Sequence, residues 1–260
     1  MTAIAFMTAN FVARETGWAM RGWGHGDRAT NDAFRPIETY EQRLDSLLED
    51  IRRLGFDTVD LWGAHLHPDW ATPEHVAIAR EQIARHRLRV STYAAWIDAS
   101  TVARACELTT ALGAATIGAG ASADLRSLVP VLREHGVTLA IENHPEKTPA
   151  EVLAKIDAGD GTLAATVDTG WWATQGYDPA QAIAELGEHV RHVHLKDVRA
   201  VEEPHETCRW GEGVVDVWAC VHSLIGTGYT GPIAIEHEPE EHDPSEECRE
   251  MLAELREWLP

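Results

Sequence analysis

The sequence predicts a single (β/α)8 barrel, and three observations indicate it. The chain has 260 residues, the usual length of one such barrel. Short apolar runs rich in β-branched residues alternate with segments of helical periodicity, and the alternation repeats eight times. Capping residues and glycines stand where the helices should begin and end. We therefore expect one domain over residues 1–260, with a parallel sheet covered by helices.

The expected strands are bounded apolar runs, as in a parallel sheet that is buried on both faces. They cover residues 3–8, 57–62, 88–93, 115–118, 137–142, 163–168, 190–195 and 232–236. The segments between them repeat their apolar residues with the period of a helix. The expected helices cover residues 39–54, 73–86, 100–112, 123–135, 148–157, 178–187, 216–226 and 244–258.

Several helix ends carry characteristic residues. Thr-Pro pairs at residues 72–73 and 148–149 and an Asp-Pro pair at 178–179 each place a capping oxygen before a proline at the first helical position. Glycine adopts positive φ easily, and four glycines stand where helices should end. They are Gly55, Gly113, Gly136 and Gly187.

Two segments are too long to be simple connections, residues 9–38 and residues 196–213. Both follow strands at the C-terminal face of the barrel, where the loops of such folds build the active site. We expect them to cover a bound substrate; the alternative is that they are disordered.

The composition argues against several classes of function. With 22 Lys and Arg against 42 Asp and Glu, the net charge of −20 repels nucleic-acid phosphates. The chain has no basic leader segment and no apolar span of 18 residues, so we expect a cytoplasmic protein without a membrane partner. No two cysteines form a C-x-x-C pair, and all four are expected to be reduced. They are Cys106, Cys208, Cys220 and Cys248.

Four polar side chains stand at the ends of the last four expected strands. These are Glu142, Asp168, His194 and Glu236. Neighbouring strands lie about 4.8 Å apart, so the four side chains can converge on one ion. Each residue alone is more simply explained by a structural salt bridge, but all four at equivalent positions indicate a metal site. Carboxylates and one imidazole without thiolate suit Mn²⁺, which we expect, with Mg²⁺ or Co²⁺ as alternatives.

The motifs IENH, VDTG, HVHLKD and AIEHE resemble those of the xylose isomerase-like barrels. That family includes sugar isomerases, ketose 3-epimerases, inosose dehydratases, the apurinic endonuclease IV group and eliminases that cleave 3-keto C-glycosides. The resemblance covers essentially the whole chain. It implies that the four strand-end residues form the family's single-metal site.

Two departures from the family pattern narrow the expected function. Many relatives have a histidine three residues after the aspartate, where this chain has Trp171. Endonuclease-like members add an Asp-x-His pair after the seventh strand, and residues 207–209 contain none. Both the absent pair and the net charge disfavour a DNA-repair enzyme with several zinc ions.

A metal at this site would favour removal of the proton beside the carbonyl of a keto-sugar. Glu142 and Glu236 are candidates for acid and base on the two faces of the sugar. His144 is a third candidate, because an imidazole titrates near neutral pH; a structural role is the alternative. Its position resembles that of the catalytic histidine in the eliminases.

Tryptophans are frequent in or near the expected loops, where indole faces can stack on a sugar or an aromatic aglycone. They are Trp18, Trp23, Trp62, Trp70, Trp96, Trp171, Trp172 and Trp210. We expect Trp23, Trp171 and Trp210 to bind substrate. For Trp62, Trp96 and Trp172, packing between barrel and helices is the alternative.

Three polar residues are further candidates for substrate binding. Lys196 follows the strand that carries His194, Arg209 lies in the second long segment, and His65 follows the second strand. A salt bridge or a hydrogen bond within the protein is the alternative for each.

The sequence thus predicts a divalent-metal-dependent enzyme that acts on a sugar or glycoside. We favour β-elimination from a 3-keto-glycoside, with ketose 3-epimerisation or sugar isomerisation as the alternative. A non-catalytic sugar-binding subunit is a hypothesis of another class. We also expect either a homo-oligomer or a complex with a second subunit.

Overall fold

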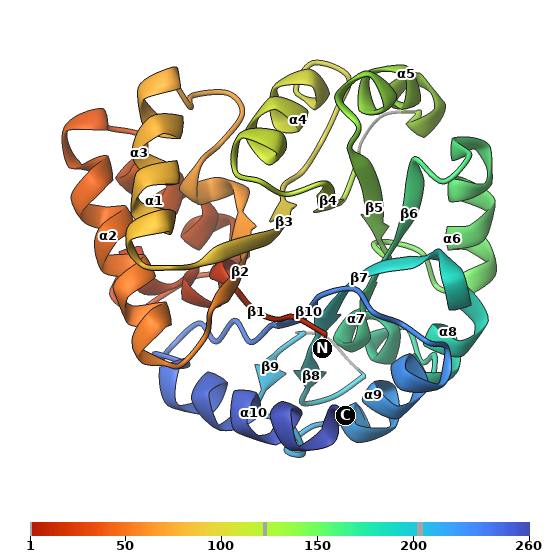
Figure 1. Ribbon diagram of the computed structural model, residues 1–260. Coiled ribbons are helices and arrows are strands. Elements are labelled where there is room, and N and C mark those ends of the chain that lie inside the picture. The colour runs from red at the N-terminus through yellow and green to blue at the C-terminus, as the bar shows by residue number, and fades with distance from the viewer. Residues whose placement is uncertain (1, 122–123, 202–204) are drawn as a thin grey trace.

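Eight parallel strands close into a barrel in the computed structural model, which describes residues 2–121, 124–201 and 205–260 (Figure 1). The strands are β1 Ile4–Met7, β2 Thr58–Trp62, β3 Arg89–Ala94, β4 Thr116–Ala119, β5 Thr138–Glu142, β6 Leu163–Asp168, β7 Val190–Leu195 and β10 Ile233–Ile235. Around the barrel they follow the order β1-β10-β7-β6-β5-β4-β3-β2. The predicted fold class is confirmed.

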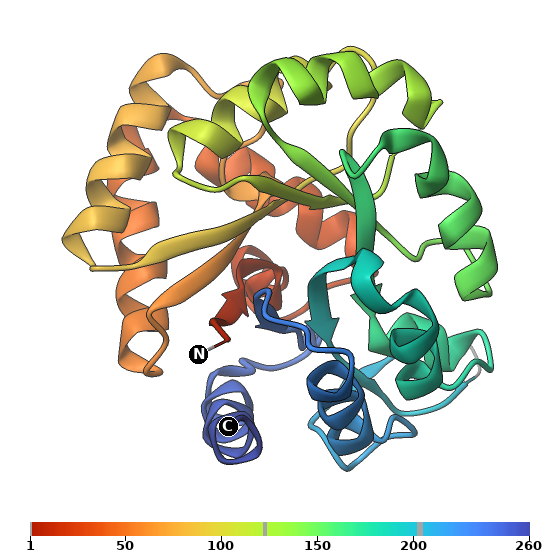
Figure 2. The same ribbon diagram turned by 45° about the vertical axis from the view of Figure 1, so that its right-hand side comes forward.

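Helices surround the barrel in Figures 1 and 2, as βα crossovers require. They are α1 Trp23–Phe34, α2 Ile37–Arg53, α3 Pro73–Arg85, α4 Val102–Ala111, α5 Leu125–His135, α6 Pro149–Ile156, α7 Thr169–Thr174, α8 Pro179–Leu186, α9 Val217–Gly226 and α10 Ser245–Trp258. Short 3-10 helices cover Thr8–Phe11, Arg14–Thr16, Gly63–His65, Asp157–Gly159 and Gly187–His189. All eight expected helices are present; residue 123, the expected first residue of α5, lies outside the described residues.

The first and last strands close the barrel. β1 pairs with β10 in parallel, with Ala5 opposite Ala234, and β10 then pairs with β7. In both views the N and C marks lie near one another (Figures 1 and 2). The register brings the carboxyl ends of β5, β6, β7 and β10 to one side of the barrel mouth.

The helices form where apolar residues repeat along one face. In α2 the buried side chains include Tyr40, Leu44, Leu48 and Ile51, spaced by three or four residues. The predicted caps are confirmed: Thr148 Oγ1 accepts from the backbone N–H of the third helical residue, and the side chains of residues 72 and 178 act in the same way. The four predicted glycines at helix ends all have positive φ.

The first long segment is more regular than expected. Residues 9–38 fold into two 3-10 helices and α1, and α2 begins at Ile37 rather than at 39. The buried residues of α1 are Gly26, Thr30 and Phe34, four apart. Two of these are small or polar, so the sequence lacks the apolar periodicity of a buried helix. A Cβ at Gly26 would lie 2.3 Å from Met20 Sδ, so the close packing of α1 against the segment that contains Met20 requires glycine at this position.

The second long segment contains a two-stranded sheet that was not expected, β8 Asp197–Val198 paired with β9 Thr207–Cys208. Asp197 is fully buried, and its carboxylate accepts hydrogen bonds from the backbone N–H groups of Gly211, Gly213 and Val215. One acid side chain thus organises the loop. Residues 202–204 of this predicted loop lie outside the described residues.

The four cysteines are free and buried, as expected of reduced thiols. Among the described residues, no helix is long and apolar enough to cross a membrane.

His65 does not face the mouth of the barrel, which corrects the expectation that it binds substrate. It ends the 3-10 helix after β2 and is 2% exposed. Its Nδ1 lies 3.1 Å from Thr8 Oγ1, and the Phe34 ring packs edge-on against it at 4.6 Å between centroids. Burial lowers the pKa of His65 to about 3, so its imidazole is neutral in the folded protein.

We predict that this histidine makes the fold sensitive to acid. Between pH 6.5 and about pH 3 the unfolded chain binds a proton that folded His65 does not, so the free energy of unfolding decreases as pH falls through this range. The loss should be about 2 kcal/mol at pH 5. Urea denaturation at pH 7 and pH 5 measures it. His65→Asn should reduce the loss, whereas His189→Asn, at an exposed position, should not. Equal losses in wild type and His65→Asn would refute the prediction.

Candidate metal centre

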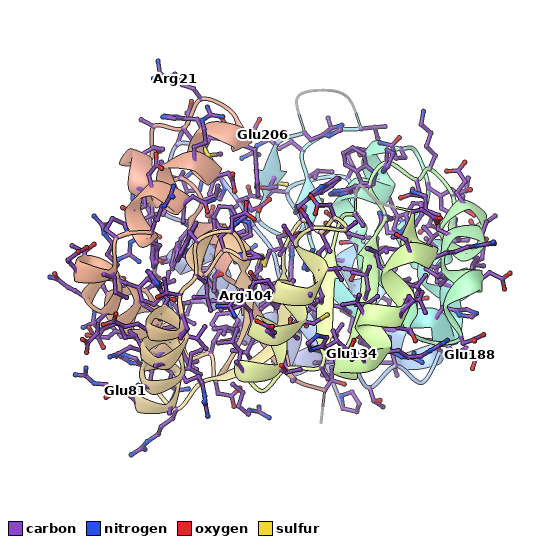
Figure 3. The ribbon with its side chains drawn as sticks, turned by 90° about the horizontal axis from the view of Figure 1, so that it is seen from above. Arg21, Glu81, Arg104, Glu134, Glu188 and Glu206 are labelled. Carbon is purple, nitrogen blue, oxygen red and sulfur yellow. The ribbon has the colours of Figure 1, made fainter. Side chains whose placement is uncertain are left out.

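The four predicted metal ligands meet in one cavity of about 590 Å³ at the C-terminal mouth of the barrel. Glu142, Asp168, His194 and Glu236 all line it. The two long segments lie on this side of the molecule. Figure 3 shows Arg21 of the first segment and Glu206 of the second at the upper edge of the view. The labelled helix-side residues Glu81, Glu134 and Glu188 lie at the lower side. The cavity is therefore where a barrel of this kind binds its substrate.

Three of the ligands form a tight group. His194 Nδ1 lies 2.5 Å from Glu142 Oε1 and 3.4 Å from Glu236 Oε2. One ligand atom from each of the three residues lies within 4.8 Å of the others. This spacing fits a single ion held between β5, β7 and the end of β10.

Asp168 is fixed beside this group by the polypeptide around it. Asn143, which directly follows β5, accepts from the Asp168 N–H at 2.7 Å and donates to the Asp168 carbonyl at 3.1 Å. Asp168 Oδ1 also caps α7 by accepting from the Trp171 N–H. Its Oδ2 is left to face the cavity, 3.4 Å from His144 Nε2 and 3.3 Å from Lys196 Nζ.

Lys196 brings a positive charge into the same space. Its Nζ lies 2.9 Å from Glu236 Oε2, 3.3 Å from Asp168 Oδ2 and 3.2 Å from Glu238 Oε2. A Cβ at residue 170 would lie 2.8 Å from the Lys196 side chain, so Gly170 of the VDTG motif makes room for the lysine. Lys196 thus lines the cavity, and Glu238 is a further cavity residue that the sequence analysis missed.

The residues present fit a divalent cation. The donors are three carboxylates and one imidazole, a set that suits Mn²⁺, Mg²⁺ or Co²⁺. Glu236 Oε2 is buried and has no partner in hydrogen-bond geometry, although it lies close to Lys196 and His194. A buried carboxylate oxygen in this condition has capacity for an ion.

Asp60, inside the barrel on β2, contacts His194, one of the four predicted metal ligands, from beneath the cavity. Its Oδ2 lies 2.9 Å from His194 Nε2 and 2.6 Å from His192 Nε2. Burial alone would raise the pKa of Asp60, yet the two imidazoles hold it at about 2. The ionised carboxylate therefore accepts a hydrogen bond from the Nε2–H of His194, which leaves Nδ1 to face Glu142 and Glu236.

The sequence analysis missed Asp60 and His192, but signals for both exist. Asp60 interrupts the apolar run TVDLW with a charge. His192 stands two residues before His194, so both imidazoles point to the same face of β7. The contact of Asp60 with His192 and His194 across the barrel interior could not be read from the chain. Gly118 on β4 makes space for it, since a Cβ there would lie 3.0 Å from His192 Cδ2.

The carboxyl groups respond differently to their shared burial. Burial disfavours the charged form of Glu142, but His144 and His194 outweigh it and hold the pKa at about 2. For Asp168, Lys196 and His144 likewise overcome burial and keep the pKa far below its ordinary value. Burial raises the pKa of Glu236 to about 8. Metal binding at this site therefore requires deprotonation of Glu236.

His144 lies beside the ligands without being one of the predicted four. Its Nδ1 is 3.6 Å from Glu142 Oε2, its ring packs on Trp171 at 4.3 Å between centroids, and its side chain is 35% exposed. Burial disfavours the imidazolium, but Glu142 and Asp168 outweigh it and raise the pKa of His144. The imidazole can therefore hold a proton beside the cavity.

Of the eight tryptophans expected in or near the loops, four line the cavity: Trp23, Trp62, Trp96 and Trp171. Trp23 packs edge-on against Trp62 and donates from Nε1 to Glu238 Oε1 at 3.3 Å. Trp96 is 60% exposed at the rim. The cavity thus offers aromatic surface along its wall and rim.

Two predicted substrate-binding residues lie elsewhere. Arg209 does not line the cavity, because its guanidinium pairs with Glu250 and Glu254 of α10. Trp210 is 3% exposed and stacks on Trp258, also of α10. These placements correct both expectations: the two residues attach the second long segment to α10.

Comparisons with known proteins agree with the fold. The family model described as xylose isomerase-like TIM barrel matches residues 48–258. Among curated proteins, no sequence matches the chain significantly.

Several solved structures are similar to the chain. The probable 3-DHS dehydratase AsbF of Bacillus anthracis, involved in petrobactin synthesis, is 13% identical over 98% of this chain and 99% of that one, with a TM-score of 0.71. D-allulose 3-epimerase from Methylomonas sp., solved in complex with D-allulose, is 14% identical over 99% and 97%, with a TM-score of 0.69. A xylose isomerase-like TIM barrel protein from Mycobacterium smegmatis, solved with magnesium, is 18% identical over 99% and 96%, with a TM-score of 0.71. At these identities the likeness establishes the fold alone.

We predict that Asp60→Asn weakens divalent-metal binding by about 10- to 100-fold, because His194 loses the charged partner that orients it and sets its tautomer. Isothermal titration of the metal-free protein with Mn²⁺ measures the change. Asp57→Asn is a matched control, since Asp57 precedes the same strand but is 62% exposed and outside the cavity. Unchanged Mn²⁺ affinity in Asp60→Asn would show that this buried pairing does not serve the metal site.

Proposed function

The chain belongs to the xylose isomerase-like TIM barrel family, and we propose that it is a divalent-metal-dependent enzyme that removes the proton beside the carbonyl of a keto-sugar. The observation that carries the proposal is the convergence of Glu142, Asp168, His194 and Glu236 in the cavity, with His144 next to them. The ketose epimerase and dehydratase among the similar structures support this class of chemistry.

A bound ion would supply Lewis-acid stabilisation of negative charge on the substrate oxygens. Mn²⁺ is our proposed ion, with Mg²⁺ or Co²⁺ as alternatives, because the donor set is rich in carboxylate.

His144 is the group that we propose removes the proton. Its Nε2 is buried and lies 3.4 Å from Asp168 Oδ2 without meeting hydrogen-bond geometry, and Trp171 packs against the ring from one side. Once a cation offsets the charges of Glu142 and Asp168, the attraction that holds a proton on His144 weakens, and its pKa moves back towards the ordinary value. An imidazole with a pKa near neutrality is suited to a general base.

We favour β-elimination from a 3-keto-glycoside among the possible outcomes. The C–H bond next to the ketone breaks, its proton passes to the base, and the electron pair forms the C=C bond as the bond to the aglycone breaks. The leaving aglycone takes up a proton. The tryptophans of the cavity, above all exposed Trp96 and Trp23, support an aromatic aglycone, because a free ketose has no such group to cover.

Ketose 3-epimerisation or isomerisation is the alternative. It needs an acid or base on each face of the sugar, and Glu142 and Glu236 both reach the cavity. Lys196 lies between Asp168 and Glu236, and we propose that it binds a substrate hydroxyl in either reaction. A non-catalytic sugar-binding subunit would not need a base beside the ligand group.

We predict that the Mn²⁺-loaded protein releases the aglycone from a 3-keto-glycoside and leaves free ketoses unchanged. Chromatography of both reactions identifies the products. Glu142→Gln and Glu236→Gln should each lower metal content and turnover, since each removes a charged ligand. Conversion of a ketose instead would support the alternative. If neither substrate reacts, or if both variants keep full metal content and activity, the proposal is wrong.

We further predict that His144→Gln lowers kcat by about 10²- to 10⁴-fold, the usual contribution of a general base, while Mn²⁺ affinity changes little. In this variant kcat/KM should no longer fall at low pH through protonation of residue 144. His189→Gln, at an exposed position beyond the opposite end of the barrel, is the matched control and should keep activity. Full activity in His144→Gln would show that His144 is not the base and would indicate Glu142 or Glu236 instead.

A further inference from the structure

A second cluster of metal-binding side chains lies outside the cavity, between the end of β10 and the first turn of α10. His237 Nε2 and His242 Nε2 each lie 2.9 Å from Glu247 Oε2. One ligand atom from each residue lies within 4.8 Å of the other two. None of the three residues lines the barrel cavity.

We propose that His237, His242 and Glu247 bind a Zn²⁺ ion distinct from the proposed catalytic metal. Two imidazole nitrogens and one carboxylate oxygen form a common zinc donor set, with the fourth position left to water. The cavity quartet is different, since three of its four ligands are carboxylates and favour harder ions.

The cluster has the support that a metal-bound imidazole requires. His237 is 1% exposed, and its other nitrogen, Nδ1, lies 3.1 Å from Thr207 Oγ1 on β9. Its backbone N–H donates to Asn10 Oδ1 at 2.9 Å. These contacts fix the ring so that Nε2 points to Glu247, as the outer partners of metal-bound histidines do.

The remaining two ligands are reachable from solvent. Glu247 is in the first turn of α10, where the helix holds its backbone, and its side chain is 30% exposed. The His242 side chain is 52% exposed, so an ion and its water have access. Glu236 and His237 are successive residues beyond a strand, and their side chains point in opposite directions, one into the cavity and the other towards α10.

The proposed ion would fasten the segment that covers the catalytic cavity. Residues 237–242 include Glu238, which contacts Lys196 and Trp23, and Glu240, whose carbonyl accepts from the Met20 N–H at 3.2 Å. The Gly22 N–H also lies 3.4 Å from Glu240 Oε2. By holding His237 and His242 to Glu247, zinc would link α10 to residues 237–242 and, through them, to the segment that precedes α1. The proposed role of this ion is structural.

The test measures zinc binding after the cavity site is disabled. In full-length Glu142→Gln/Asp168→Asn protein stripped with a chelator, we expect one Zn²⁺ per chain by isothermal titration and by elemental analysis. Adding His242→Ala or Glu247→Gln should reduce this to none or weaken binding by at least 100-fold. Adding His222→Ala, an exposed histidine on α9, should leave one Zn²⁺.

Two results would overturn the proposal. One is that the parent double variant binds no zinc, and the other is that its zinc stays bound when His242 and Glu247 are replaced. As a second readout, Zn²⁺ should slow amide hydrogen exchange in residues 237–242 of the parent and not in His242→Ala. These measurements do not depend on turnover, so they stand apart from the test of the proposed reaction.

Discussion

The concentration of buried charge at the mouth of the barrel is the constraint on which the site depends. Glu142, Asp168 and Glu236 lie close together there, and Asp60 lies just beneath. Isolated buried carboxylates would be strongly destabilising, and removing one partner of a buried pair costs about 3–5 kcal/mol. His194 between two glutamates and Lys196 against three carboxylates supply the compensating charge. The same carboxylates that need compensation are suited to bind a divalent cation.

The surrounding structure keeps these charges in place. Asn143 links the ends of β5 and β6, and Gly170 leaves room for the lysine. The loop after β10 and the segment that leads into α1 are joined over the cavity through Glu238 and Trp23. Since a low dielectric strengthens every interaction in the site, this cover contributes to the electrostatics as well as to substrate binding.

The strand-end residues and the alternation of strands and helices were predictable because each is a local property. The periodicity of α2 and the run before Asp168 can be read without knowing what packs against them. Predictions failed where a distant partner decides the structure. Arg209 was predicted to bind substrate because nothing near it in the sequence shows that its guanidinium pairs with Glu250 and Glu254 of α10.

The sequence by itself determined the barrel and the four polar residues at the ends of its strands, because the hydrophobic period and the alternation of side chains along a strand are local properties of the chain. Only the tertiary structure decided which residues contact those four. Asp60 is 134 positions from His194, and their contact exists because closure of the barrel lets side chains of β2 and β7 meet in its interior. Tertiary structure likewise placed His65 in the core and His144 at the cavity, since burial depends on what the rest of the chain covers.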